Sequence, residues 1–303
     1  MNPTPPIPRH EHPTELTLEL PGGLTLAALA WGPEEGRPVL ALHGWMDNAA
    51  SFATLAPRLV AGEGAPRLVA LDLPGHGRSG HRPPGVTYHF IDWVADVVEA
   101  ADALGWARFA ILGHSMGAGV GLLTAGALPE RVERLVMLDG IGPMTTDAVG
   151  APARLKSALT SERRKRGAAR GPRIHGSIAE MVARRRLASG VSDEAARWLV
   201  ERAVVAEGGG WRYRHDPRLR GSSRLRLTEG HVEAFARALR CPLLVVKASG
   251  SPAVPAGLVE SRLRGVAATV EEVEGGHHVH LEAPERVAPL VRSALVADLD
   301  PVR

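Results

Sequence analysis

The chain has 303 residues, of which 45% are apolar and 23% charged, enough for a sizeable core in one large domain. No apolar run approaches the roughly 18 residues of a membrane span, and the proline-rich start lacks the apolar segment of a secretory signal. Cys241 is the only cysteine, which excludes an intramolecular disulfide and is typical of a cytoplasmic protein.

The net charge of +3 is unevenly distributed along the chain. Residues 151–226 contain 19 lysines and arginines against 7 acidic residues, so the rest of the chain is net negative. This segment therefore differs in composition from its surroundings.

The first part of the chain predicts an arm and then a hairpin. Residues 1–13 are expected to form a flexible arm. Residues 16–20 and 24–30 flank Pro21-Gly22-Gly23, which predicts an antiparallel hairpin at the edge of a sheet.

Short apolar runs then alternate with segments of helical spacing. The runs are residues 39–42, 67–71, 109–112, 134–138, 242–246 and 268–273, and the helical segments include residues 91–104, 116–128 and 284–297. This alternation predicts an α/β fold in which helices cover both faces of a mostly parallel central sheet.

The alternation stops over residues 143–239, where arginine is frequent. Helical patterns at residues 178–187 and 192–205 precede a break at Gly208-Gly209-Gly210. Because a long insertion between strands is usually functional, we expect a mostly helical lid over residues 143–239. The core is then expected in two parts, residues 1–142 and 240–303.

One glycine-rich turn carries a candidate nucleophile. Ser115 lies in Gly113-His114-Ser115-Met116-Gly117, directly after a predicted strand and before a predicted helix. In that context the glycines allow strand and helix to crowd together and let the serine hydroxyl point outward. The alternative is a purely structural turn.

A serine hydroxyl needs a base, and we predict His277. It follows Gly275-Gly276 after the last apolar run, which places it at the carboxyl edge of a parallel sheet. His278 is the alternative base, whereas His280 is expected to pack or to cap a helix.

The acid that orients the base is expected to be Asp139. The loop after residues 242–246 contains no carboxylate, but Asp139 ends the apolar run at residues 134–138, one strand from Ser115. The alternatives are that Asp139 only caps a loop and that Glu260 or a more remote acid serves.

An oxyanion pocket requires preorganised N–H donors. We predict the backbone N–H of Met116 and that of Trp45, which follows Gly44 after the run at residues 39–42. Either Asp47 or Asn48 is expected to cap the next helix.

Several aromatic residues and histidines are candidates for pocket walls. Candidate substrate-pocket residues are Trp45, His114 and Trp211, although a packing role is equally open for the tryptophans and is favoured for buried His114. Trp198 and Tyr213 are further candidates for an acyl pocket, and His76 is expected to be structural.

The motifs HGWMDNAASF, LDLPGHGRSG, GHSMGAG, VMLDG and GGHHVHLEAPE occur in this order. Together they resemble the α/β-hydrolase superfamily, and most closely its serine hydrolase-like protein group. The resemblance implies a Ser-acid-His triad with Ser115 and His277. Many members carry the acid after the strand matching residues 242–246, whereas haloalkane dehalogenases place it after the strand before the lid, as Asp139 would be.

The sequence thus predicts a serine hydrolase of carboxylesterase type that acts on a small-molecule ester, lactone or thioester without metal or organic cofactor. The alternatives are a non-catalytic ligand-binding protein and a hydrolase of carbon–carbon bonds in β-diketones.

The arginines of the insertion favour a solvated surface or a clamp for an anionic substrate group. With 4% aromatic residues, and none within Arg163-Arg164-Lys165-Arg166, no nucleic-acid partner is expected. The oligomeric state stays open.

Overall fold

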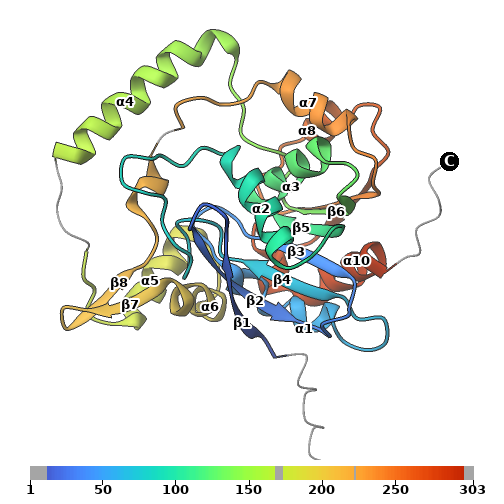
Figure 1. Cartoon of the computed structure of the whole chain (residues 1–303), viewed down its shortest axis with the longest axis horizontal. Helices are drawn as coiled ribbons and strands as arrows, with labels where there is room; N and C mark the ends of the chain where they lie inside the picture. The colour runs from blue at the N-terminus through green and yellow to red at the C-terminus, as the bar shows by residue number, and fades with distance from the viewer. Residues whose placement is uncertain (1–11, 168–172, 222, 297–303) are drawn as a thin grey trace, which may run out of the picture.

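The computed structural model describes residues 12–167, 173–221 and 223–296 (Figure 1). Most of the predicted N-terminal arm, and the side chains of residues 164–167 in the basic run, lie outside what it describes. Within the described residues, no helix has the length and apolar character needed to cross a membrane.

A central sheet organises the fold, and its strands lie in the order β1-β2-β4-β3-β5-β6-β9-β10. The strands are β1 Thr14–Glu19, β2 Thr25–Trp31, β3 Pro38–Leu42, β4 Arg67–Leu71, β5 Phe109–His114, β6 Val132–Leu138, β9 Leu243–Ala248 and β10 Thr269–Val273. The first two form the predicted antiparallel edge hairpin, and β2 pairs antiparallel with β4. All pairs from β4 to β10 are parallel, which confirms the predicted sheet.

Helices cover both faces of this sheet (Figure 1). One layer contains α2 Asp92–Ala103, α3 Met116–Ala127, α7 Glu229–Arg237 and α8 Leu258–Arg262, and the other contains η2 Ala49–Phe52, α1 Ala56–Leu59 and α10 Pro284–Val296. Alternate strand residues enter different cores: Leu40 packs in the first layer and Ala41 in the second. Because both faces are buried, strands such as β3 read as continuous apolar runs.

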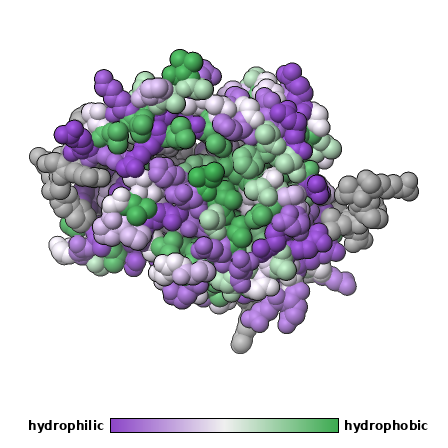
Figure 2. Space-filling model, turned by 45° about the horizontal axis from the view of Figure 1, so that its top comes forward, coloured by the Kyte–Doolittle hydropathy of each residue, from purple (hydrophilic) through white to green (hydrophobic). Residues whose placement is uncertain are grey.

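The inserted segment has a small core of its own. It contains the helices α4 Ala151–Gly167, α5 Ile178–Ser189 and α6 Asp193–Ala203. This core is a buried cluster separate from the two on the faces of the sheet. It contains residues of α5 and α6, including Met181 and Leu199, together with Leu281 of the short helix α9 Val279–Glu282. By contrast, Leu155 and Leu159 of α4 are exposed, each at 44%. Figure 2 brings the top of Figure 1 forward and shows apolar surface near the middle of that face, with hydrophilic side chains around it.

The insertion departs from the predicted helix and break over residues 192–210. Helix α6 ends at Ala203, and β7 Val204–Glu207 and β8 Gly210–Tyr213 form an antiparallel hairpin. Gly208 and Gly209 have φ angles of 58° and 77°, the backbone that a tight two-residue hairpin turn requires. The predicted glycine break is therefore a turn between strands.

Helix α7 lies in the stretch predicted as insertion, yet it packs on the sheet layer. Val232 and Ala236 join the buried cluster that contains α3. A Cβ on Gly126 of α3 would lie 2.5 Å from the Phe235 carbonyl oxygen, so the two helix backbones approach closely. Residues 143–239 thus include one sheet-covering helix.

Candidate active site

Ser115 occupies a strained turn between β5 and α3. Its φ and ψ angles are 51° and −111°, which a residue with a side chain rarely adopts. A Cβ on Gly117 would lie 2.0 Å from the Leu42 carbonyl oxygen, and one on Gly113 would lie 2.5 Å from the Gly117 oxygen. Both glycines are therefore required by the close approach of strand and helix.

His277 lies between Ser115 and Asp139. Its Nε2 is 3.0 Å from the Ser115 Oγ, and its Nδ1 is 2.6 Å from the Asp139 Oδ2. A carboxylate only accepts hydrogen bonds, so Nδ1 donates and Nε2 is left to accept the serine proton. The three residues form one continuous hydrogen-bonded series.

Asp139 is fixed at the end of β6. Its carboxylate is buried, its backbone φ is 43°, and its Oδ1 accepts a hydrogen bond of 3.1 Å from the Ala248 N–H. Its own N–H donates to the Val246 oxygen at 2.8 Å. The neighbouring strand β9 thus supplies backbone partners, while the carboxylate on the imidazole comes from β6.

The residues considered as alternative base or acid contact neither Ser115 nor His277 through a hydrogen bond in the described structure. His278 turns its Nε2 toward Asp47, at 3.0 Å from Oδ2. Glu260 is exposed on α8. His280 packs: its Nε2 lies 2.8 Å from the Ser51 Oγ, and its ring centroid is 4.1 Å from that of His114.

The loop after β3 forms a tight turn beside Ser115. The Asp47 N–H donates to the Gly44 oxygen at 3.1 Å, and Met46 has a φ of 64°. Arg185 of α5 donates to the Met46 oxygen at 3.0 Å. This loop carries the Trp45 N–H, while the Met116 N–H lies in the first turn of α3, where backbone donors lack intrahelical acceptors.

Asn48, rather than Asp47, caps the next helix. Its side-chain oxygen accepts from the Ala50 N–H at 3.0 Å. Asp47 is buried and contacts His278 and Arg185 instead. Burial alone would raise the pKa of Asp47, but His278, Arg185 and His114 together hold it well below its usual range. No local sequence pattern marks this role, because the partners lie on other elements, far from Asp47 in sequence.

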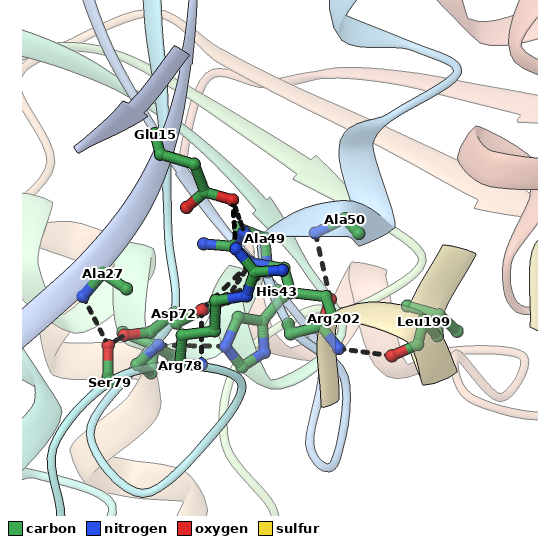
Figure 3. Close-up of polar contacts among 12 residues, drawn as sticks. Glu15, Ala27, His43, Ala49, Ala50, Asp72, Arg78, Ser79, Leu199 and Arg202 are labelled. Atoms are coloured by element: carbon green, nitrogen blue, oxygen red, sulfur yellow. Dashed lines mark hydrogen bonds and ion pairs between the residues drawn. The ribbon is translucent and has the colours of Figure 1, made fainter. Parts of the chain in front are cut away.

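A buried ion pair joins the insertion to the core (Figure 3). Arg202 of α6 donates through Nε to both oxygens of Asp72, each at 3.0 Å. Asp72 also accepts from the backbone N–H groups of Ala49 and Arg78 at 2.7 Å each. Asp72 thus holds α6 against the start of η2, and Asn48 adds a 2.7 Å bond to the Leu199 oxygen.

A cavity of about 1020 Å³ opens in front of Ser115 and His277. Trp45 lines it from the core, and Tyr213 lines it from the insertion. Among the described residues, three arginines also border it, Arg184, Arg185 and Arg220, against the single carboxylate of Asp47.

Two predicted pocket residues are placed differently. His114 is fully buried behind the nucleophile, outside the cavity lining, because neighbouring strand residues point to opposite sides. Trp211 packs in the core of the insertion, and its backbone pairs with His175. Trp198 borders a separate cavity of about 370 Å³.

His76, predicted to be structural, is buried, and its ring centroid lies 4.9 Å from that of His43. Burial, followed by the charge of His43, lowers the pKa of His76 to about 3.

Comparison with known proteins agrees with this architecture. Residues 37–284 match the family model described as alpha/beta hydrolase fold. The chain therefore belongs to the α/β-hydrolase family, and its similarity within that family is to the serine hydrolase-like proteins. It is 34% identical to the serine hydrolase-like protein of Danio rerio, with 93% of this chain and 88% of that protein covered.

Comparison with solved structures also finds similar proteins. The crystal structure of a hypothetical protein from Pseudomonas aeruginosa PAO1 is 40% identical with a TM-score of 0.85, covering 92% of this chain and 98% of the other. A thioesterase domain from the curacin biosynthetic pathway is 25% identical with a TM-score of 0.78, covering 92% and 98%. These similarities support a hydrolase.

Proposed function

We propose that this chain is a serine hydrolase that cleaves an ester-type bond of a small molecule through an acyl-enzyme intermediate. The observation that carries the proposal is the series in which the Ser115 Oγ, the His277 imidazole and the Asp139 carboxylate follow one another at 3.0 and 2.6 Å. The absence of an acid after β9 favours a non-catalytic protein, whereas the 2.6 Å contact between Asp139 and His277 supports the hydrolase.

In this mechanism Ser115 attacks the substrate carbonyl carbon and gives its proton to the His277 Nε2. Asp139 stabilises the resulting imidazolium. The Trp45 and Met116 N–H groups hold the oxyanion of the tetrahedral intermediate. When the intermediate collapses, His277 returns the proton to the leaving alcohol or thiol, and the acyl group stays on Ser115.

The second half repeats these steps with water. His277 removes a proton from a water molecule, whose oxygen attacks the acyl carbon. Collapse of the second intermediate releases the carboxylic acid and returns the proton from His277 to Ser115. The cycle needs no other reactant, and carboxylic esters, lactones and thioesters all fit it.

Charge around the cavity favours a substrate with an anionic group. Arg184, Arg185 and Arg220 border the space in front of Ser115. Arg185 is engaged by Asp47, while Arg184 reaches Glu180 only at 4.0 Å. Guanidinium groups bind carboxylate and phosphate through paired hydrogen bonds, so this wall suits an acyl chain or alcohol that bears such a group.

The hydrolytic function is tested with a panel of p-nitrophenyl and thioester substrates of different acyl lengths. Wild-type protein should hydrolyse at least one of them, and Ser115→Ala should lower kcat by about a thousandfold or more, because the nucleophile is lost. Ser251→Ala is a matched control, because its Oγ lies 3.5 Å from the His277 Nδ1 without contacting the nucleophile. Equal rates for wild type and Ser115→Ala would refute the proposal.

The anionic preference predicts a selective loss in an Arg184→Gln, Arg220→Gln double variant. For an ester with a free terminal carboxylate, kcat/KM should fall about tenfold or more, whereas the methyl-capped neutral analogue should change less than about threefold. Added salt should weaken wild-type activity only on the charged ester. Equal losses on both esters would show that these arginines do not recognise the anionic group.

A further inference from the structure

Three buried side chains converge beneath the turn at residues 44–47. They are Asp47 after β3, His114 at the end of β5 and His278 before α9. One potential ligand atom from each lies within 4.8 Å of the others. The Asp47 Oδ2 is 3.0 Å from the His278 Nε2 and 3.8 Å from the His114 Nδ1.

The hydrogen bonds of His114 fix which of its nitrogens is free. Its Nε2 lies 2.8 Å from the His277 carbonyl oxygen, which only accepts, so the proton is on Nε2. In a neutral imidazole whose proton is on Nε2, the Nδ1 presents a lone pair.

This lone pair faces another acceptor. The His114 Nδ1 is buried, has no hydrogen-bond partner among the residues that the structure describes, and points toward the Asp47 carboxylate. Two acceptors facing each other in a buried space are unfavourable unless a donor or a cation lies between them. The arrangement calls for a positively charged or proton-bearing group at this point.

Gly44 leaves room beside both atoms. A Cβ at this position would lie 3.0 Å from the His114 Nδ1 and 3.1 Å from the Asp47 Oδ2. Asp47 and His278 also line the large cavity, which gives the cluster an opening to solvent.

We propose that Asp47, His114 and His278 form a binding site for a divalent transition-metal ion such as Zn²⁺. Two imidazoles and one carboxylate are a common zinc ligand set, with bonds of about 2.0–2.2 Å. The carbonyl that accepts from the His114 Nε2 is the outer partner that metal-binding histidines usually have. Coordination through the His278 Nε2 requires the proton of this nitrogen to move to Nδ1.

The other contacts of Asp47 leave room for a metal ion at this site. Arg185 donates to the Asp47 Oδ1, which leaves Oδ2 for the metal. Ser115 and His277 supply no ligand, so the site is separate from the proposed triad. Its test measures metal binding and does not depend on hydrolytic activity.

The experiment is a calorimetric titration of the metal-free, full-length chain with Zn²⁺, repeated with Co²⁺ while visible absorption is recorded. We expect one ion per chain and the absorption bands of a low-coordinate Co²⁺ site. Asp47→Asn, His278→Gln and Gly44→Ala should each weaken Zn²⁺ binding about tenfold or more. Gly44→Ala keeps all three ligands and places a methyl group beside the His114 Nδ1 and the Asp47 Oδ2.

His277→Gln and His215→Gln are the controls, because both side chains line the same cavity outside the cluster. They should bind Zn²⁺ like wild type, and circular dichroism should show every variant folded. Absence of Zn²⁺ binding by wild type would overturn the proposal. Loss of Zn²⁺ binding in His277→Gln would also overturn it. The same holds if Gly44→Ala and those of the Asp47 and His278 variants that remain folded all bind Zn²⁺ like wild type.

Discussion

Ester hydrolysis by Asp139→Asn should be about a thousandfold to ten-thousandfold slower than by wild type, with little change in KM. The asparagine amide has nearly the same shape but donates a hydrogen bond, so it favours the wrong tautomer of His277 and cannot stabilise the imidazolium. The effect should be large because the carboxylate is buried at 2.6 Å from the ring. Steady-state kinetics on the preferred ester measure it.

The control for this variant is Glu260→Gln, which removes an exposed carboxylate from α8. It should keep wild-type kcat within about twofold, as expected for an exposed side chain without a contact to His277 in the described structure. If Asp139→Asn retained rates close to wild type while Glu260→Gln did not, the acid would have to be reassigned. The assignments of Ser115 as nucleophile and His277 as base would not be affected.

Asp72→Asn is expected to lower the free energy of unfolding by about 3–5 kcal/mol. Asp72 and Arg202 are both buried, so removing the carboxylate charge leaves the buried guanidinium with only the half-exposed Glu15, at 2.7 Å, as its counter-ion (Figure 3). The backbone N–H groups of Ala49 and Arg78 each bond one of the two carboxylate oxygens, and asparagine keeps only one oxygen for them. Urea unfolding followed by tryptophan fluorescence gives the difference.

Arg78→Gln provides the comparison within the same network. Arg78 reaches Glu15 at 2.7 Å, but both side chains are about half exposed, so solvent screens the pair and its loss should cost less than about 1 kcal/mol. Similar destabilisation by Asp72→Asn and Arg78→Gln would contradict the view that burial of the Asp72–Arg202 pair is what matters.

Sequence patterns predicted the parts of the fold that depend on local information. Strand β5, the glycines around Ser115 and helix α3 follow from apolar runs and steric needs within a dozen residues. The position of Asp139 followed from topology, because adjacent parallel strands end at the same edge of a sheet. The same reasoning placed His277 in a loop at that edge.

Features that depend on distant partners escaped this reasoning. The contact of Asp47 with His278 joins residues far apart in sequence, and the Arg202–Asp72 pair joins the insertion to the core. Whether the His114 side chain points into the cavity or away from it depends on the direction of side chains at the end of β5. The position of Trp211 depends on the β7–β8 hairpin, where the sequence predicted only a glycine break after a helix.

The most direct measurement for the central claim is the mass of the protein after reaction with a fluorophosphonate, followed by peptide mapping. The account predicts one adduct per chain on Ser115, formed much more slowly in His277→Gln, because the hydroxyl then lacks its base. An adduct on another residue, or labelling of Ser115→Ala to the same extent as wild type, would contradict it.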